Sequence, residues 1–203
     1  MKGRVKGMSV VIAKQEARKA KKNRKARKSA KINTAADVSW AGTFHAIGAR
    51  LLRTNAKRVN LRPNFTILPR ADSEDLIELL RHELGLTKSQ KLFPKSATCH
   101  EIFSRMANAQ ESLKIVLERF PDCEEWEPKL AELHTAYIAT KQAQNVLDFD
   151  DLLTYWDEML KDQRLAAKIG GSFDHIIVDE FQDTNSVQAS ILRRLKPTGK
   201  GVM

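Results

Sequence analysis

The feature that most constrains the fold is a short apolar run that ends in two acids. Residues 173–178, FDHIIV, continue directly into Asp179 and Glu180. The run has the length and β-branched content of a buried strand, and Gly170-Gly171 separates it from the helical pattern before it. In open α/β sheets, ligands bind beyond the carboxyl ends of the strands. Two carboxylates placed there are costly unless a cation needs them. The pattern therefore predicts a cation-dependent site at the end of a buried strand.

The side chains around this acidic pair fit nucleotide hydrolysis. In nucleotide hydrolases, a first acid after the strand holds Mg²⁺ and a second orients and deprotonates the attacking water. Asp179 and Glu180 match these two positions, and Gln182 offers a donor and an acceptor suited to sensing a γ-phosphate or that water. The alternative is an acidic, solvent-facing turn, which the full string of residues 178–185, VDEFQDTN, makes less favoured than the catalytic interpretation.

The net charge of +10 describes a tail rather than the body of the protein. Thirteen of the 35 Lys and Arg residues, but one of the 25 acids, lie in residues 1–31, so that segment carries +12 and the other 172 residues carry −2. Such a basic segment can contact phosphates without reading sequence. A solvated, poorly ordered tail is the favoured interpretation, and a high pI says little about nucleic-acid binding by the rest of the chain.

Cysteine spacing and hydropathy exclude several classes of protein. Cys99 and Cys123 have no Cys-x-x-Cys partner, so we expect buried residues rather than a disulfide framework or a zinc site. Residues 8–13 are too short for a secretory segment, and no stretch approaches the roughly 20 apolar residues of a membrane span. We expect a cytoplasmic protein.

The order of elements predicts an α/β fold with a mostly helical insertion. A strand over residues 38–43 and an amphipathic helix from Phe44 to about Lys57 come first, and a proline-bounded linker, residues 62–69, follows. Four helices are then expected, the first of them capped by Asp72 or Ser73 and closed by Gly85. The final elements are a helix after Asp148, the strand at 173–178 and a last helix capped by Asn185. Two strands alone make no stable sheet, so the architecture looks unfinished.

Three segments carry a family resemblance. Residues 178–185 resemble motif II of the UvrD/Rep-type superfamily 1 DNA helicases, residues 42–45 (GTFH) resemble the Thr-Phe-His motif of that family, and residues 147–153 (LDFDDLL) resemble its acidic-aromatic motif. The resemblance implies an incomplete P-loop NTPase, or RecA-like, motor domain. The implied divisions are a basic tail at 1–37, part of motor domain 1A at 38–60, a helical subdomain 1B at 61–145, and a return to domain 1A at 146–203.

The same resemblance implies roles for individual residues. Asp179 would bind Mg²⁺, Glu180 would be the catalytic base and Gln182 a coupling residue, with ATP as the bound nucleotide. Thr43, Phe44 and His45 would lie against DNA, either single-stranded or a 3′-tailed duplex. Phe44 is also expected to be the first core residue of its helix, a role compatible with DNA contact, and for His45 a purely structural hydrogen bond is nearly as favoured as a DNA contact. For Asp148, Asp150 and Asp151, the start of a helix explains the acids better than a site does.

The departures from the family pattern decide what the chain alone is expected to do. No G-x-x-x-x-G-K-[ST] phosphate loop occurs, and the basic tail stands where the family has its adenine-contacting and Thr-rich motifs. The family also continues into a phosphate-sensing motif and a second motor domain. We therefore expect a fragment of an ATP-dependent 3′-to-5′ DNA helicase, inactive alone, from a truncated or rearranged reading frame. The alternative is a non-enzymatic DNA-binding or interaction module, and a metal-dependent nuclease is disfavoured.

Overall fold

The computed structural model describes residues 9–14, 40–87 and 93–203. The elements follow in the order β1 (Ser9–Lys14), β2 (Trp40–Thr43), α1 (Phe44–Asn55), η1 (Ala56–Val59), β3 (Thr66–Ile67), α2 (Arg70–Glu83), α3 (Ser96–Ala109), α4 (Leu113–Leu117), η2 (Pro121–Trp126), α5 (Glu127–Gln144), β4 (Val146–Leu147), α6 (Phe149–Met159), α7 (Gln163–Gly170), β5 (Phe173–Val178), η3 (Phe181–Asp183) and α8 (Ser186–Leu195). Most described residues are helical, and the strands are few and short.

The main sheet has the order β2-β1-β5, with β1 antiparallel to both neighbours. Since β2 and β5 each run against β1, they run in the same direction, and both end beside the start of β1: Thr43 pairs with Ser9 and Val178 pairs with Val10. The carboxyl ends of β2 and β5 therefore lie at one edge of the sheet, two strand spacings apart, or on the order of 10 Å.

The central strand β1 was not predicted. The sequence assigned its residues to the basic tail, because the four apolar residues 10–13 before a strongly charged segment give no periodic signal of their own. Pairing on both edges explains why the run is a strand. The remainder of the expected tail, residues 1–8 and 15–37, lies outside the described residues, as do residues 38 and 39 of the first expected strand.

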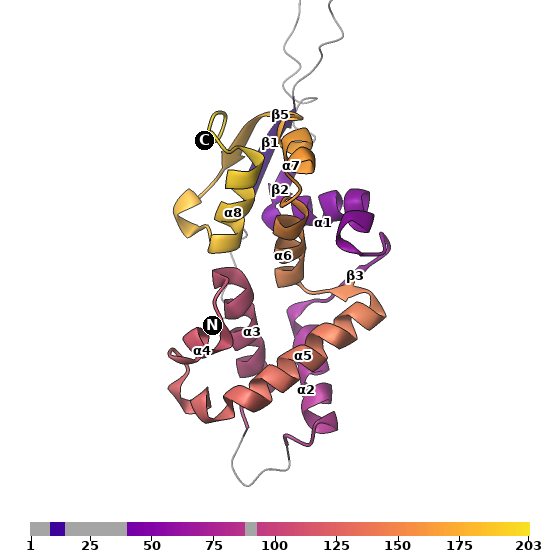
Figure 1. The fold of residues 1–203 in the computed structure, drawn as a ribbon, viewed down its shortest axis with the longest axis vertical. Coiled ribbons are helices and arrows are strands. Elements are labelled where there is room, and N and C mark those ends of the chain that lie inside the picture. Colours follow the sequence, from indigo (N-terminus) through magenta and orange to yellow (C-terminus); the bar gives the residue numbers. More distant parts are fainter. Residues whose placement is uncertain (1–8, 15–39, 88–92) are drawn as a thin grey trace, which may run out of the picture.

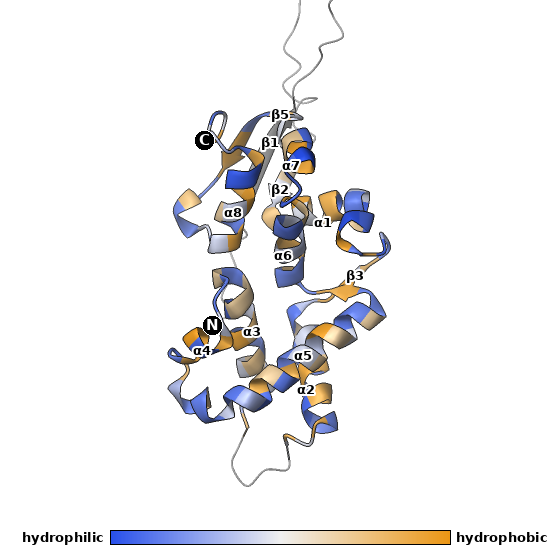
Figure 2. Cartoon of the chain, in the orientation of Figure 1, coloured by the Kyte–Doolittle hydropathy of each residue, from blue (hydrophilic) through white to orange (hydrophobic). Residues whose placement is uncertain are grey.

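The described residues form two hydrophobic cores, which define two bodies (Figure 1). The sheet body comprises the main sheet, residues 40–67 and residues 145–203. The helical block comprises α2 to α5, residues 70–144. In Figure 2 the longer helices carry both hydrophobic and hydrophilic residues, as amphipathic helices around a core should. No helix among the described residues combines the length and apolar character needed to cross a bilayer.

Within the sheet body, α1 packs closely on α6. Phe44, Leu52 and Trp156 are almost fully buried there, and the rings of Phe44 and Trp156 are 6.1 Å apart between centroids. Gly48 permits the approach, because a Cβ at this position would come within 3.1 Å of the Trp156 ring. The apolar spacing that predicted α1 therefore gives its buried face, although the helix ends at Asn55 and continues as a 3₁₀ turn.

The two bodies are joined by a short ladder. The linker expected at 62–69 contains β3, which pairs in parallel with β4, so the chain enters and leaves the helical block side by side. The backbone N–H of Leu68 donates to the carbonyl of Leu147 at 2.8 Å. Two-residue strands carry too little pattern to be predicted locally.

The helix ends test the capping predictions. Gly85 has a left-handed φ of +70° after α2, as expected of a closing glycine. The cap expected at Asp72 or Ser73 is wrong: α2 begins one turn earlier, after Pro69, and Ser73 is buried within it. The Ser73 N–H donates to the Pro69 carbonyl at 2.9 Å, so the rigid proline rather than a side-chain acceptor sets the start. Cys99 and Cys123 are both buried in the helical block, as expected.

Candidate nucleotide and nucleic-acid site

The acidic pair, Asp179 and Glu180, directly follows β5, a strand that is hydrogen-bonded on both of its sides. β5 pairs with β1 on one side, and on the other the N–H groups of Ile176 and Val178 donate to the carbonyls of Gly201 and Met203 at 2.7 and 2.8 Å. Ile176 is fully buried, while Asp179 and Glu180 are exposed. The strand thus presents both carboxylates to solvent at the carboxyl edge of the sheet, where the sequence predicted them.

The backbone turns sharply at Glu180. Its φ of 53° and ψ of 48° place it in the left-handed region, which costs a non-glycine residue about 1–2 kcal/mol. The 3₁₀ turn η3 follows, and the amide Nε2 of Gln182 donates to the Oε2 atom of Glu180. The structure therefore brings together two of the predicted site residues, with the amide oriented by the carboxylate that it touches.

Residues 179–184 form an acidic loop, and a helix cap fixes its far end. The Asn185 Oδ1 accepts from the N–H of Gln188 at 2.8 Å, and the Gln188 side chain accepts from the N–H of Asn185 at 3.1 Å. This reciprocal capping box confirms the predicted start of α8. Residues 179–184 are consequently held between β5, which is hydrogen-bonded on both sides, and the capped helix α8.

The Thr-Phe-His segment lies at the same edge of the sheet, at the end of β2. The Thr43 Oγ1 caps α1 by accepting from the N–H of Ala46 at 3.2 Å. Phe44 is 1% exposed against Trp156. Phe44 therefore has the core role expected of the first residue of its helix, and its expected contact with DNA stays a prediction.

His45 is half-buried and lies against an exposed ring. Its imidazole meets Phe149 edge to face, with centroids 5.5 Å apart and planes at 85°. Burial lowers the pKa of His45 below its ordinary value, and the nearby Asp150 carboxylate opposes that shift only in part. A neutral imidazole can donate or accept a hydrogen bond at neutral pH, but it offers no full positive charge to a phosphate.

The acids of the LDFDDLL segment begin α6, as predicted. The Asp148 Oδ1 accepts from the N–H of Asp151 at 2.8 Å, and the Asp151 Oδ2 accepts from the N–H of Asp148 at 3.0 Å. This capping box satisfies the free N–H groups at the start of the helix.

The same two acids also hold a buried lysine that the sequence analysis missed. Lys141 of α5 is 5% exposed and donates to Asp148 at 2.5 Å and to Asp151 at 2.6 Å, while the Tyr137 hydroxyl donates to Asp148 at 2.9 Å. Burial opposes the charge on Lys141, but the attraction of Asp151 and Asp148 outweighs it and raises the pKa of the lysine. Lys141 is thus a buried cation that ties the helical block to the sheet body.

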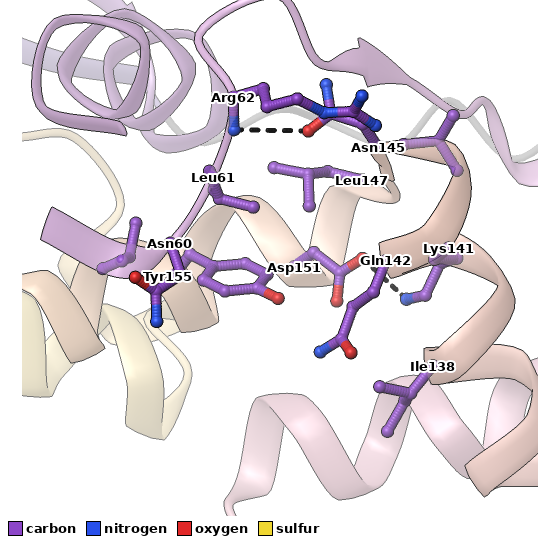
Figure 3. A pocket seen from close by; sticks show the side chains of 12 residues that line it. Asn60, Leu61, Arg62, Ile138, Lys141, Gln142, Asn145, Leu147, Asp151 and Tyr155 are labelled. Atoms are coloured by element: carbon purple, nitrogen blue, oxygen red, sulfur yellow. Dashed lines mark hydrogen bonds and ion pairs between the residues drawn. The ribbon is translucent and has the colours of Figure 1, made fainter. Parts of the chain in front are cut away.

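The two carboxylates respond differently to this lysine. Burial would raise the pKa of Asp148, but the charge and hydrogen bonds of Lys141 and its other donors lower it instead. For Asp151, burial together with the neighbouring Asp148 charge raises the pKa to about 6. Figure 3 shows Asp151 and Lys141 in the wall of a pocket of about 400 Å³ between the linker after η1, α5 and α6. Lys141 donates to one oxygen of Asp151. We therefore interpret Asp151 as a residue that stabilises the fold rather than as a residue that binds a ligand in this pocket.

One amide joins the acidic loop to the start of α6. Asn108 of α3 accepts from the Asn185 Nδ2 at 2.6 Å and donates to the Asp150 Oδ1 at 2.7 Å. No local pattern could have identified Asn108, because its partners lie 77 and 42 positions away in the chain.

Comparison with known proteins decides the family. The family described as the UvrD/REP helicase N-terminal domain matches residues 1–203, the whole of the chain. The chain belongs to the UvrD/REP helicase family. Membership implies a P-loop NTPase fold, and it confirms the resemblance seen in the three sequence motifs.

Two relatives show how much of a UvrD/REP protein the chain covers. It is 35% identical to DNA helicase II of Haemophilus influenzae over 73% of this chain and 20% of the relative. It is 27% identical to the ATP-dependent DNA helicase PcrA of Leuconostoc citreum over 84% of this chain and 22% of the relative. The chain therefore spans about a fifth of the length of the relatives that it matches.

Proposed function

We propose that this UvrD/REP chain is part of an ATP-dependent 3′-to-5′ DNA helicase that acts in the cytoplasm on single-stranded or 3′-tailed DNA. In this proposal Asp179 binds Mg²⁺, Glu180 is the catalytic base and Gln182 couples the nucleotide to the rest of the protein. The observation that carries the proposal is the left-handed turn at Glu180. It keeps an exposed acid in a conformation that costs energy, and it sets Gln182 against that acid.

The exposed acids fit a magnesium nucleotide in their chemistry. Mg²⁺ prefers carboxylate and phosphate oxygens and takes only one or two carboxylates from the protein when phosphates supply the rest. Asp179, exposed at the carboxyl edge of the sheet, offers such an oxygen. Bound Mg²⁺-ATP would supply the phosphoryl group to be transferred. The 203 residues contain no G-x-x-x-x-G-K-[ST] loop to cradle its phosphates, so we propose that this chain alone does not turn ATP over.

The nucleic-acid side of the proposal rests on the shared edge of the sheet. Thr43 and Val178 end parallel strands on either side of β1. A DNA strand beside Thr43 and His45 would therefore lie on the order of 10 Å from the acidic loop. That separation is short enough for one rigid element to connect the two sites.

The second candidate, a non-enzymatic DNA-binding module, is favoured by the basic segment of residues 1–31. The two candidates differ in which residues carry DNA binding. Deleting the whole segment would remove β1, so the informative variant changes the nine Lys and Arg residues of 15–31 to Gln in the full-length chain. His45→Ala tests the DNA contact proposed beside Thr43 and His45, and His82→Ala on α2 is its matched control.

The measurement is fluorescence anisotropy with single-stranded, 3′-tailed and blunt DNA at several salt concentrations. The helicase proposal expects the charge-neutralised chain to keep a preference for tailed over blunt DNA, and His45→Ala to weaken that binding while His82→Ala does not. Binding that vanishes with the basic residues and is indifferent to His45 would establish the binding module instead.

A further inference from the structure

One carboxylate oxygen in the helical block is buried without a hydrogen bond. Glu111 follows α3 and is half-buried, and its Oε2 atom is shielded from solvent yet accepts from no residue that the structure describes. Buried polar atoms in folded proteins almost always have a partner, and leaving a charged one unpaired is costly. A hydrogen-bond donor that reached this oxygen from outside these residues would therefore be stabilised there.

The turn that carries Glu111 is fixed. Gln110 ends α3 in the left-handed region, with φ of 58° and ψ of 38°, a conformation that is unfavourable for a residue other than glycine. The N–H of Glu111 then donates to the carbonyl of Met106 at 3.2 Å. Backbone strain of this kind is concentrated at ligand-binding and catalytic sites. The backbone position of Glu111 is thus set before any ligand binds.

Glu111 lines a cavity of about 340 Å³ between α3, α5 and the start of α6. Met106, Ala107 and Ile138 give this cavity an apolar wall, and Ile138 is 37% exposed in spite of its apolar side chain. Small-molecule sites are typically concave, mostly apolar and provided with a few polar groups that orient the ligand, in volumes of about 300–1,000 Å³. The cavity has this form.

The charge around the cavity is negative. The described residues that line it include four acids and one lysine, an excess of three negative charges: Glu111, Asp148, Asp150, Asp151 and Lys141. Burial and the charge of Lys141 lower the pKa of His134, which also lines the cavity, so its imidazole adds no positive charge at neutral pH. A partly buried excess of negative charge favours a ligand that is a cation.

Three of the four acids already have donors. Lys141 donates to Asp148 at 2.5 Å and to Asp151 at 2.6 Å, and Asn108 donates to Asp150 at 2.7 Å. The fourth acid is the one with the unpaired oxygen. The positive group of a ligand would therefore be held at the Glu111 end of the cavity, beside the apolar wall.

We propose that the cavity binds a small organic cation, an amine with an apolar body, whose ammonium group donates to the Oε2 atom of Glu111 while the body packs on Ile138 and Met106. Hydrogen bonds between two charged groups are about twice as strong as those between neutral groups. The inference goes beyond the proposed function, because the cavity is lined by none of the residues assigned to the nucleotide or to DNA. Its walls come from the helical block and from α6, so a bound amine also bridges the two bodies.

The test uses the full chain and phenethylamine as the probe, with isothermal titration calorimetry. Phenethylamine should bind saturably and should raise the Tm, because a ligand that binds the folded state stabilises it. Glu111→Gln keeps the shape of the side chain but removes its charge, and it should weaken binding roughly tenfold or more. Glu118→Gln is the matched control, because Glu118 is an exposed acid just after α4.

A neutral analogue measures the contribution of the charge without any substitution in the protein. 2-Phenylethanol has a similar body and no charge, so it should bind the wild type roughly tenfold more weakly than phenethylamine does, and Glu111→Gln should leave its affinity unchanged. This comparison remains decisive if Glu111→Gln fails to fold.

The apolar wall is tested separately. Ile138→Ala should weaken the binding of phenethylamine severalfold, because it removes apolar surface from the contact. Ile115→Ala on α4 is the control, since Ile115 is 46% exposed and does not line the cavity.

The outcomes are distinguishable. Saturable binding that is weakened both by Glu111→Gln and by loss of the amine charge supports the inference. Absence of saturable binding, equal affinity of wild type and Glu111→Gln, or equal affinity for phenethylamine and 2-phenylethanol overturns it. The helicase proposal is tested by DNA binding and stands or falls independently of these results.

Discussion

The Asn185 amide donates to the Oδ1 atom of Asn108 at 2.6 Å, and this hydrogen bond joins the end of the acidic loop to the helical block. Asn108 also donates to the Oδ1 atom of Asp150 near the start of α6. One side chain of α3 therefore contacts both the end of the loop assigned to the nucleotide and the start of α6. Its amide acts as acceptor and donor at once, which neither a carboxylate nor an apolar side chain can reproduce.

Replacing Asn108 should loosen this junction. In Asn108→Ala, Asp150 and Asn185 each lose a partner in a partly buried place, so the free energy of unfolding should fall by about 1–3 kcal/mol. Urea unfolding measures this change, and Gln144→Ala, which removes an exposed amide on α5, is the control. A loss no larger than that of the control would show that Asn108 is not a support of the junction.

Lys141→Met should be more costly than the loss of any surface ion pair. The substitution keeps most of the volume but leaves the carboxylates of Asp148 and Asp151 facing each other without their cation. Breaking a buried pair in this way costs about 3–5 kcal/mol. Lys129→Met, at a site where the lysine side chain is 52% exposed, should change the free energy of unfolding by less than about 1 kcal/mol. Similar effects of the two substitutions would contradict the buried role of Lys141.

The raised pKa of Asp151 predicts an unusual pH dependence. Its folded pKa of about 6 lies above the ordinary value of 3.8, so between these values the folded state binds more protons than the unfolded state. The contribution of Asp151 to stability therefore falls as pH rises from about 4 to about 6. Asp151→Asn lacks this contribution, so its free energy of unfolding relative to the wild type should rise across that window, by at most about 3 kcal/mol. Urea unfolding at several pH values measures the difference, and a difference that stays constant or falls would contradict the assignment.

Phosphate release tests the proposed inactivity of the chain alone. With ATP, Mg²⁺ and single-stranded DNA we expect no release above a blank without protein, because phosphoryl transfer depends on positioning the phosphates and the sequence has no loop to hold them. The decisive contrary observation is turnover by the wild type that Glu180→Gln abolishes, since that would require a phosphate site elsewhere in the chain.

The sequence predicted those elements whose signals are local. β5 was predicted with the bounds it has, α8 by its asparagine cap, α6 by its acids and α1 by its apolar spacing. β1, β3 and β4 were missed because each becomes a strand only through pairing with distant residues. The distinction is between signals carried within one element and interactions made between elements.

The candidate site divides in the same way. The motif residues Thr43, Asp179 and Glu180 lie where a strand-to-helix pattern places them, at the ends of β2 and β5. Residues that act across the junction, Asn108 and Lys141, had no signal at all, since their partners come from other helices. The exposure of Phe149 could not be predicted either, because an aromatic residue at the start of an apolar helix fits a core position equally well.

The β3–β4 ladder has a consequence for how such proteins can vary. Because the chain leaves and re-enters the sheet body through adjacent backbone positions, with Thr66 and Leu68 bonded to Asn145 and Leu147, the distance to be bridged is fixed by two hydrogen bonds. The number of residues between these two hydrogen bonds can change at little entropic cost, because the entropy lost on closing a loop increases only slowly with its length. The ladder therefore holds the two ends of the helical block side by side at the sheet body, independently of how many residues lie between them.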